Sequence, residues 1–516
     1  MKKISRRDFL KVTGLVGAAA ALTACGGSAS STAASTASSA AGSAAASTAA
    51  LGADTQAIVD RGVLKVGVKN AVKGFSFQDT LTGEYKGLED SLAEMIAEHL
   101  GVDVEFTTVT AATRGELLDS GDIDCVLATF TITEKGYSYN DADLNCGLSP
   151  VFALGKVTAL LYERFKAGRL PLTVQSMDNC SHNGSKVQAG VFAYAERWVR
   201  DGLVPQDFLD YIKDETKITF PWSMIDKITP RPHEKVKELL AQDGFEDNNY
   251  IETSRHTFTA PFVNSEETQY LVVEDHYTNG RPPLNLGGVI YTSREIVDKV
   301  ETMKVTTCLN PLHTAMAIFG CLLGYDLISA EIADSDIRAL VQKTGYIEAM
   351  PVVTDPGILN PYEFIGAFIN KRLPNPFMPD TPQRIAMDTS QKLAIRFGET
   401  IKKYLSRGLD TGNLVLIPLI LAAYARYLKG IQDDGTPFEP SPDPLLKELQ
   451  NIVAPLTIGK PDQDFSCLEK LYRRKDVFGL DLYEAGFGNR IEHMVRELFK
   501  GDESVRATLH KYVTER

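Results

Sequence analysis

Three side chains in the segment ETMKVTTCLNPLH, at 301–313, have types suited to proton transfer and to holding an oxygen atom. Lys304 has an ordinary pKa of about 10.4, and burial among the apolar residues that follow it would lower this value, making it a base near neutrality. The Asn310 amide donates hydrogen bonds without titrating, and His313 falls in the first turn of a helix, where the dipole disfavours a charged imidazole. Each also has a structural interpretation: a solvated lysine, a helix N-cap and a core histidine.

Two other segments, MDNCSHNG at 177–184 and QRIAMDTSQK at 383–392, carry further groups of this kind. Asn179 offers a second amide that donates without titrating. Arg384 and Lys392 are eight residues apart, close to two helical turns, so one helix could direct both cations to one polyol or carboxylate. A base and donors that do not titrate are the groups that a protein supplies for proton transfer to or from an oxygen of a bound substrate.

The composition excludes some classes of function. A chain of 516 residues, 44% apolar and 23% charged, can hold several domains with large cores. A net charge of −13 argues against a nucleic-acid partner, because no basic stripe is available to neutralise phosphates. The cysteines are odd in number and form no CxxC, and there is no HExxH or clustered histidine, so we expect reduced thiols and no metal. The seven cysteines are Cys25, Cys125, Cys146, Cys180, Cys308, Cys321 and Cys467.

The N-terminus predicts export and membrane attachment. Residues 1–25 combine a basic start, the twin-arginine word SRRDFLK and a short apolar run. LTAC, which ends at Cys25, resembles a bacterial lipobox and predicts lipidation of that cysteine. The Ser/Ala-rich segment 26–55 cannot build a core and predicts a flexible linker. The apolar run at 414–428 is too short to span a membrane and contains a proline and an arginine, so it predicts a buried helix.

Apolar periodicity predicts an α/β region after the linker. Strands at 64–69, 103–109 and 124–130 alternate with helices at 88–100 and 113–119, an order typical of a parallel sheet.

Residues 60–134 resemble the periplasmic amino-acid-binding proteins of ABC importers. The segments that carry this resemblance are GFSFQD, TGEYKGLEDSLAEMIAEHLG and RGELLDSGDIDCVLATFTITE. In that family an arginine that binds the ligand's carboxylate follows TITE within two residues. Lys135 and Gly136 occupy these positions, and the second lobe of that family is missing. We therefore expect amino acids to bind poorly or not at all.

From Thr131 to the C-terminus the chain resembles the mannitol dehydrogenase and fructuronate reductase family, a metal-independent group of long-chain polyol dehydrogenases. The words that carry this resemblance are TITEKGY, ALLYERFKAGRLPLTVQSMDNCSHNG, FPWSMIDKITPRP, APFVNSEETQYLVVED, VETMKVTTCLNPLHTA, GYIEAMPVVTDPGILNPYEFI and NPFMPDTPQRIAMDTSQK. It implies an incomplete or hybrid Rossmann-like α/β region, made of a half-lobe at 56–130 and the remainder of a Rossmann-type domain at 131–255. A mainly α-helical substrate and catalytic domain would follow at 256–516. It further implies NAD(H) or NADP(H), a polyol or keto-uronate substrate, and a monomer.

The resemblance implies roles for individual residues. Lys304 would be the catalytic base, while Asn179, Asn310 and His313 would hold the substrate. The other implied site residues are Asp226, Arg384 and Lys392 for substrate (Asp226 alternatively orients the base), Glu301 for gating proton exchange with solvent, and Asp178 with Asn179 for cofactor. The gap from Lys304 to Asn310 is one residue longer than in the family pattern.

The family's Gly-rich dinucleotide turn is missing from the sequence. That turn follows the first strand and cradles the pyrophosphate, with an acidic residue about 20 positions later on the ribose. After the strand at 64–69 the chain reads NAVKGFSFQD, and GFGNRI at 486–491 follows no strand and favours a helix start. We therefore predict severely reduced affinity for NAD(H).

Three functions are compatible with the sequence. We predict an NAD(P)-dependent oxidoreductase of a sugar alcohol or aldonate, with a uronate favoured over mannitol. The alternatives are a lipid-anchored amino-acid-binding component of an ABC importer, and a join of two sequences with neither function. TITE, at 131–134, is shared by both patterns and marks the seam. The N-terminus predicts an exported, membrane-anchored lipoprotein, whereas the enzyme portion resembles cytoplasmic proteins.

Overall fold

A computed structural model describes the chain from residue 53 onward, with gaps. The described residues are 53–72, 76–109, 113, 117, 120–121, 132, 136–138, 141–145, 147–230, 232–245, 248–252, 258–278, 280–282, 284–378, 380–460 and 462–515. The signal segment with Cys25, most of the linker, the strand predicted at 124–130 and all of the TITE seam except Ile132 lie outside them. Contacts divide the chain into two units. Unit 1 is Met1–Thr129, Arg231–Asn264 and Gly280–Pro282, and unit 2 is Phe130–Pro230, Ser265–Asn279 and Pro283–Arg516.

Unit 1 contains a parallel strand pair joined through a helix. Strand β1 (Val63–Val68) pairs with β5 (Asp103–Thr108), and helix α3 (Leu88–Leu100) lies between them in sequence. The pairing follows from apolar side chains on one side of each element, such as Leu64 and Ala97, which are buried. Helix α3 ends where Gly101 adopts the left-handed conformation, with φ of 70°. The strands predicted at 64–69 and 103–109 and the helix at 88–100 are confirmed; the helix predicted at 113–119 lies largely outside the described residues.

Short elements complete unit 1. A three-stranded antiparallel sheet of order β2-β3-β4 stands between β1 and α3 in the sequence. The remaining elements are α2 (Ala53–Arg61), β2 (Ala71–Val72), β3 (Ser76–Gln78), β4 (Tyr85–Lys86), α10 (Glu234–Gln242), β9 (Ile251–Glu252) and β10 (Phe258–Thr259).

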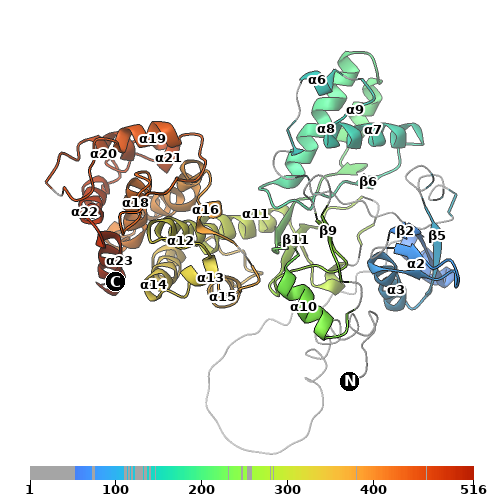
Figure 1. Ribbon diagram of the computed structural model, residues 1–516. Coiled ribbons are helices and arrows are strands. Elements are labelled where there is room, and N and C mark those ends of the chain that lie inside the picture. The colour runs from blue at the N-terminus through green and yellow to red at the C-terminus, as the bar shows by residue number, and fades with distance from the viewer. Residues whose placement is uncertain are drawn as a thin grey trace, which may run out of the picture. The chain divides into compact units, whose positions relative to one another are not determined.

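The first part of unit 2 packs helices on short strands (Figure 1). Strands β6 and β7 pair in parallel, and a mixed sheet has the order β12-β11-β8. An apolar cluster that includes Trp198 and Phe208, neither of which is exposed, joins the helices. The elements are α6 (Asp141–Leu144), α7 (Ala153–Lys166), β6 (Leu172–Thr173), α8 (Asn183–Arg200), α9 (Gln206–Lys213), β7 (Ile218–Thr219), β8 (Ser223–Asp226), β11 (Tyr270–Glu274), η1 (Leu284–Gly287) and β12 (Ile290–Thr292).

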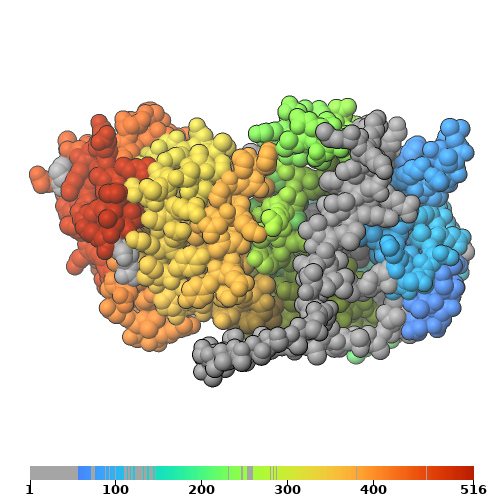
Figure 2. Space-filling view, turned by 90° about the horizontal axis from the view of Figure 1, so that it is seen from below, coloured from blue at the N-terminus to red at the C-terminus, as the bar shows by residue number. Residues whose placement is uncertain are grey.

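From residue 294 onward unit 2 is helical, and its elements, yellow to red in Figure 2, pack as one mass. Four of the helical segments, η2, η3, η5 and η7, are π-helices. The first half comprises α11 (Arg294–Met303), η2 (Lys304–Cys308), α12 (Asn310–Leu322), α13 (Ile328–Glu331), α14 (Ser335–Lys343), η3 (Thr344–Ala349), η4 (Met350–Val352), α15 (Pro361–Ala367) and η5 (Phe368–Arg372). The second half comprises α16 (Pro382–Ile385), η6 (Thr389–Gln391), η7 (Ala394–Gly398), α17 (Glu399–Ser406), η8 (Thr411–Asn413), α18 (Leu416–Tyr427), α19 (Leu446–Val453), α20 (Cys467–Tyr472), α21 (Lys475–Phe478), α22 (Gly488–Leu498) and α23 (Ser504–Glu515).

Helices α12 and α18 form the centre of the helical core. Every residue of α18 is buried, which confirms the buried helix predicted at 414–428, and each buried leucine contributes roughly 2 kcal/mol. The buried Arg426 within it donates to the carbonyls of Ile431 and Gln432, while its Nε atom has no partner among the described residues. The continuous helix Arg294–Leu322 is long and apolar enough to cross a membrane, but 83% of its most apolar window is buried. Helix α22 begins at Gly488, which confirms the helix start predicted for GFGNRI.

Candidate active site

Lys304 is a buried lysine at the junction of α11 and η2. Its side chain is almost completely enclosed, with 4% of the residue exposed. The Nζ atom donates to Asn179 Oδ1 at 2.7 Å and to the Ile225 carbonyl at 3.0 Å. Burial lowers the pKa of Lys304, against the opposing charges of Asp226 and Glu301. A lysine in this setting releases its proton more readily than a solvated one, and the solvated alternative is wrong.

The turn after Lys304 is wound as a π-helix. Segment η2 spans Lys304–Cys308, and the Leu309 N–H donates back to the Lys304 carbonyl at 3.1 Å. A π-turn holds one more residue than an α-turn. It therefore accommodates the extra residue between Lys304 and Asn310.

Asn310 begins α12 with its side chain available. The N-cap position belongs to Leu309, and no side-chain capping bond is made there, so the N-cap interpretation of Asn310 is wrong. Within the part of the chain that the structure describes, the Asn310 amide makes no hydrogen bond. Pro311, which follows it, has a fixed φ suited to the first turn of a helix. The amide remains free to hold an oxygen of a bound molecule.

A network of buried polar groups fixes the loop that carries Asn179. Asp178, which is buried, accepts from the Tyr137 hydroxyl at 2.6 Å and from the Ile132 N–H at 2.9 Å. The Asn183 amide donates to the Asp178 carbonyl at 2.9 Å and to Ser223 Oγ at 2.8 Å. These bonds hold the exposed Asn179 against Lys304, and among the described residues its amide nitrogen has no hydrogen-bond partner.

Arg372 is buried between two carboxylates. It donates to both oxygens of Asp226, at 2.7 and 2.8 Å, and to both oxygens of Glu266, at 2.8 and 2.9 Å. Glu266 also accepts from the Ile228 N–H at 2.7 Å. Asp226 is therefore committed to Arg372. Sequence reasoning missed Arg372 and Glu266, because bidentate pairing between residues this far apart in the chain leaves no local pattern.

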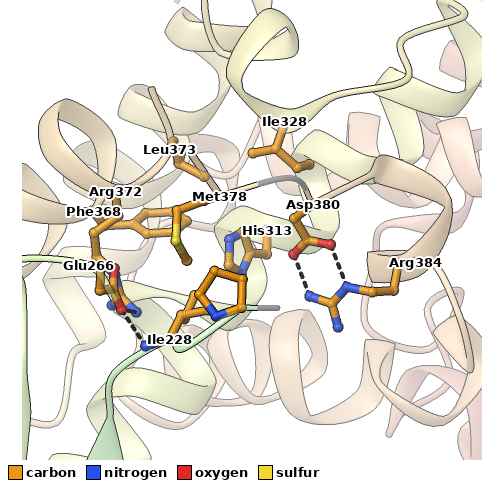
Figure 3. Close-up of a pocket in the computed structure, with 11 residues that line it drawn as sticks. Ile228, Glu266, His313, Ile328, Phe368, Arg372, Leu373, Met378, Asp380 and Arg384 are labelled. Atoms are coloured by element: carbon orange, nitrogen blue, oxygen red, sulfur yellow. Dashed lines mark hydrogen bonds and ion pairs between the residues drawn. The ribbon is translucent and has the colours of Figure 1, made fainter. Parts of the chain in front are cut away.

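A pocket of about 260 Å³ opens in unit 2 and is lined mostly by residues of its helical part (Figure 3). His313 lies in it, with its ring edge-on to Phe368 at 4.6 Å between centroids. Burial, and next the charge of Arg372, lower the pKa of His313 to about 3, so the imidazole is neutral at physiological pH. This matches the neutral form predicted for it. The lining residues are Ile228, Pro230, Glu266, His313, Ile328, Phe368, Arg372, Leu373, Met378, Asp380 and Arg384.

Arg384 and Lys392, predicted to lie on one helix, do not lie on the same helix. Helix α16 ends at Ile385, and Asp388 adopts the left-handed conformation, with φ of 52°. Arg384 lines the pocket and donates two bonds to Asp380 (Figure 3). Lys392 instead donates to the carbonyls of Met387 and Ile385 at the end of α16. The single-helix prediction is wrong because Asp388 breaks the helix between them.

Glu301 lies one helical turn before Lys304 on α11. It is buried, and its Oε2 accepts from the His182 N–H at 3.4 Å. His182 itself is stacked on Trp222, with ring centroids 4.1 Å apart, and its Nε2 lies 2.8 Å from Asp298. The loop that carries Asn179 is therefore tied to the helix that carries Lys304.

A dinucleotide would need a phosphate cradle at the end of the first strand. In the described residues that follow β1, the chain enters the β2–β4 sheet, and α3 starts only at Leu88 after Gly87. Asp178, expected on the cofactor side, is enclosed and bonded to Tyr137. The described residues after β1 therefore form no Gly-rich cradle of the kind that a pyrophosphate needs. In unit 2, Lys304 and Asn179 supply groups suited to the reacting alcohol of a substrate.

Three family profiles match the chain. The mannitol dehydrogenase C-terminal domain matches residues 296–499. The profile of bacterial extracellular solute-binding proteins, family 3, matches 64–136, and the profile of the twin-arginine translocation pathway signal sequence matches 3–23. The twin-arginine signal predicted for residues 1–25 is confirmed and suggests export; the lipid anchor stays a prediction.

Known relatives and structures align over most of the chain. The chain is 50% identical over 401 residues to the D-mannonate oxidoreductase of Thermotoga maritima, covering 75% of this chain and 74% of that protein. It is 30% identical over 363 residues to mannitol dehydrogenase 2 of Saccharomyces cerevisiae, covering 68% and 67%. A crystal structure of substrate-free D-sorbitol dehydrogenase superposes with a TM-score of 0.62 at 25% identity, covering 79% of this chain and 80% of that one.

The Pseudomonas fluorescens mannitol 2-dehydrogenase ternary complex with NAD and D-mannitol superposes with a TM-score of 0.55 at 22% identity, covering 88% and 94%. At this identity the likeness concerns the fold alone. Together with the sorbitol enzyme it confirms the predicted fold class, an α/β region followed by a mainly helical domain.

Proposed function

Because the chain belongs to the mannitol dehydrogenase family, whose members are oxidoreductases of polyols and aldonates, we propose that it interconverts an aldonate with its keto-uronate. The 50% identity to a D-mannonate oxidoreductase supports an acidic substrate over a neutral polyol. The observation that carries the reaction is the buried Lys304 with its Nζ on the Asn179 amide.

Lys304 is the proposed base. In its neutral form it takes the proton of the substrate hydroxyl as that carbon becomes a carbonyl, and it returns the proton in the reverse direction. The lowered pKa makes this neutral form accessible at a working pH. When bound, a nicotinamide supplies the hydride acceptor.

The substrate oxygen is proposed to be held by neutral donors. The Asn310 amide and the uncharged His313 imidazole both stand on the first turn of α12 and can donate without changing charge. The NH2 of Asn179 adds a third donor, because its oxygen is used by Lys304.

A substrate screen tests this function. Purified protein would be given NADH and then NADPH at several millimolar, with fructuronate, tagaturonate or fructose, and oxidation of the cofactor would be followed by absorbance. We expect fructuronate to be reduced fastest, and the result also separates NAD from NADP use. Turnover of fructose alone, or none with any of the three, would contradict the proposed function.

We also infer weak cofactor binding. It is supported by the β2–β4 sheet that takes the place of a Gly-rich turn after β1. Titration of NADH followed by its fluorescence should give a dissociation constant above about 1 mM, since the pyrophosphate lacks its usual donors. Micromolar binding would overturn this inference.

A second candidate function is supported by the match of residues 64–136 to solute-binding proteins. It is a lipid-anchored amino-acid-binding component of an ABC importer. Lys135 and Gly136 stand where that family has its carboxylate-binding arginine, so calorimetry with the common amino acids should give no binding heat. Micromolar binding of any amino acid would favour the second candidate over the dehydrogenase.

A further inference from the structure

Arg396 is a partly buried cation that none of the proposed steps uses. It stands on η7, and its Nη1 donates to the hydroxyl of Thr314, the fifth residue of α12. Its Nε atom is buried and has no hydrogen-bond partner among the residues that the structure describes. Thr314 is itself buried and follows His313 directly in the chain. Arg396 thus lies against the helix end that presents Asn310 and His313.

The charge of Arg396 is uncompensated. Within the described parts of the chain it makes no ion pair, and burial lowers its pKa to about 10 with no carboxylate opposing the shift. In contrast, Arg372 and Arg384 are each paired with carboxylates. A partly buried guanidinium without an anion is costly, and an anion that binds to it from solution would offset this cost.

Arg396 has further positive charge near it. The charge of Arg396 contributes to lowering the pKa of Lys392 and of His313. The positive end of the α12 dipole points the same way, since α12 is a 13-residue helix that starts at Asn310. Arg396 and the α12 dipole therefore contribute positive potential at His313, against the negative charges of Asp380 and Asp226.

We propose that Arg396, held by Thr314 and assisted by Lys392, binds the carboxylate of a sugar-acid substrate and thereby sets the preference for aldonates over neutral polyols. This rests on the proposed function for the identity of the substrate. A guanidinium matches a carboxylate through two parallel N–H donors, whereas a neutral polyol offers no such partner. The carboxylate would lie against Arg396 near Thr314, and the carbon chain would lead from there to the reacting carbon at Asn310 and His313.

Binding measured without cofactor tests the subsite directly. D-mannonate and D-mannitol would be titrated into wild type, Arg396→Gln, Arg396→Lys and the control Arg407→Gln, followed by calorimetry and thermal shift. Arg407 is an exposed arginine of the same helical region that donates to the Pro351 carbonyl. We expect Arg396→Gln to weaken mannonate binding roughly 100-fold and to leave mannitol binding unchanged, while Arg396→Lys loses less and Arg407→Gln loses nothing.

Stability separates a binding role from a structural one. Because the Arg396 charge has no partner in the described residues, Arg396→Gln should keep or raise the melting temperature of the free protein. A lowered melting temperature together with equal loss of mannonate and mannitol binding would overturn the proposal, as would unchanged mannonate binding in Arg396→Gln. If mannonate binding depends on Arg396 but no substrate turns over, the subsite stands and the proposed reaction fails. If fructuronate turnover is normal in Arg396→Gln, the subsite fails and the reaction stands.

Discussion

At the residue scale, two basic side chains are moved toward their neutral forms by the same cause. Lys304 and His313 stand on the successive segments η2 and α12, and burial is the largest contribution to the lowered pKa of each. Arg372 adds to the effect on both, while Asp226 opposes it. A neutral lysine accepts a proton and a neutral histidine donates a hydrogen bond, so one environment prepares two different roles.

The pKa of His313 predicts how stability depends on pH. The folded value of about 3 lies below the ordinary value of 6.5, so the unfolded chain binds the proton first. The contribution of His313 to the free energy of unfolding is therefore complete above about pH 6.5 and is lost as the pH falls toward 3. In His313→Gln the loss of stability between pH 7.5 and 5, measured by urea unfolding, should be smaller than in wild type. An equal or larger loss would contradict the buried neutral imidazole.

The pairing of Arg372 with two buried carboxylates predicts that substitutions in this cluster have non-additive effects on the free energy of unfolding. Arg372→Met leaves Asp226 and Glu266 buried without a cation, which should cost about 3–5 kcal/mol of unfolding free energy. The triple variant Arg372→Met/Asp226→Asn/Glu266→Gln removes the uncompensated charges and should recover much of that cost. Urea unfolding of both variants at pH 7.5 checks this, and equal stability of the two would refute the charge argument.

At the element scale, the first turn of α8 depends on a close approach of backbones. A Cβ on Gly184 would lie 2.5 Å from the Phe220 carbonyl oxygen and 2.6 Å from that of Pro221. Gly184→Ala should therefore lower the unfolding free energy by roughly 1–3 kcal/mol and loosen the loop that presents Asn179. Gly366→Ala is the matched control, since its Cβ would meet only the Tyr346 hydroxyl at 3.4 Å inside helix α15. A Gly184→Ala protein as stable as Gly366→Ala would show that the approach is not tight.

Elements with a clear apolar period could be predicted from the sequence, and irregular ones could not. The strand at 64–69 and the helix at 88–100 follow from spacing, and the buried helix at 414–428 follows from composition. The break at Asp388 could not be foreseen, because a left-handed aspartate leaves the apolar period of its neighbours intact. Likewise the π-turn at Lys304 appeared in the sequence only as a gap one residue too long.

The site residues also divide into those that the sequence could identify and those that it could not. Lys304, Asn310 and His313 lie within one short segment, so a motif could identify them together. Arg372 and Glu266 meet from positions 106 residues apart, and Arg396 meets Thr314 from 82 residues away. Contacts of this range depend on how helices pack, which no local pattern of the sequence encodes.

At the scale of the whole molecule, the chain joins the features of two kinds of protein. Its family match begins at residue 296, while the solute-binding match ends at residue 136 and a twin-arginine signal precedes both. A twin-arginine route can carry folded proteins, which makes export compatible with a folded helical core. Lipid attachment at Cys25 is the proposed anchor.

Lipid anchoring at Cys25 predicts that one substitution changes the cell fraction in which the protein is found. Cys25→Ser should move the exported protein from the membrane pellet to the soluble fraction, because the only proposed lipid site is removed. Fractionation followed by immunoblotting measures this, with Cys467→Ser as the control, since Cys467 lies in helix α20. Retention of Cys25→Ser in the pellet would contradict lipid anchoring at this residue.

The central claim is that Lys304 is the base of an aldonate dehydrogenase, and its most direct test is the rate of D-mannonate oxidation as a function of pH in wild type and Lys304→Met. NAD and NADP would be supplied at several millimolar to offset weak binding. We predict a wild-type rate that rises with pH through an ionisation below the ordinary lysine value of 10.5, and a Lys304→Met rate at least about 10³-fold lower without that ionisation. A Lys304→Met enzyme that keeps both the rate and the pH profile of wild type would contradict the claim.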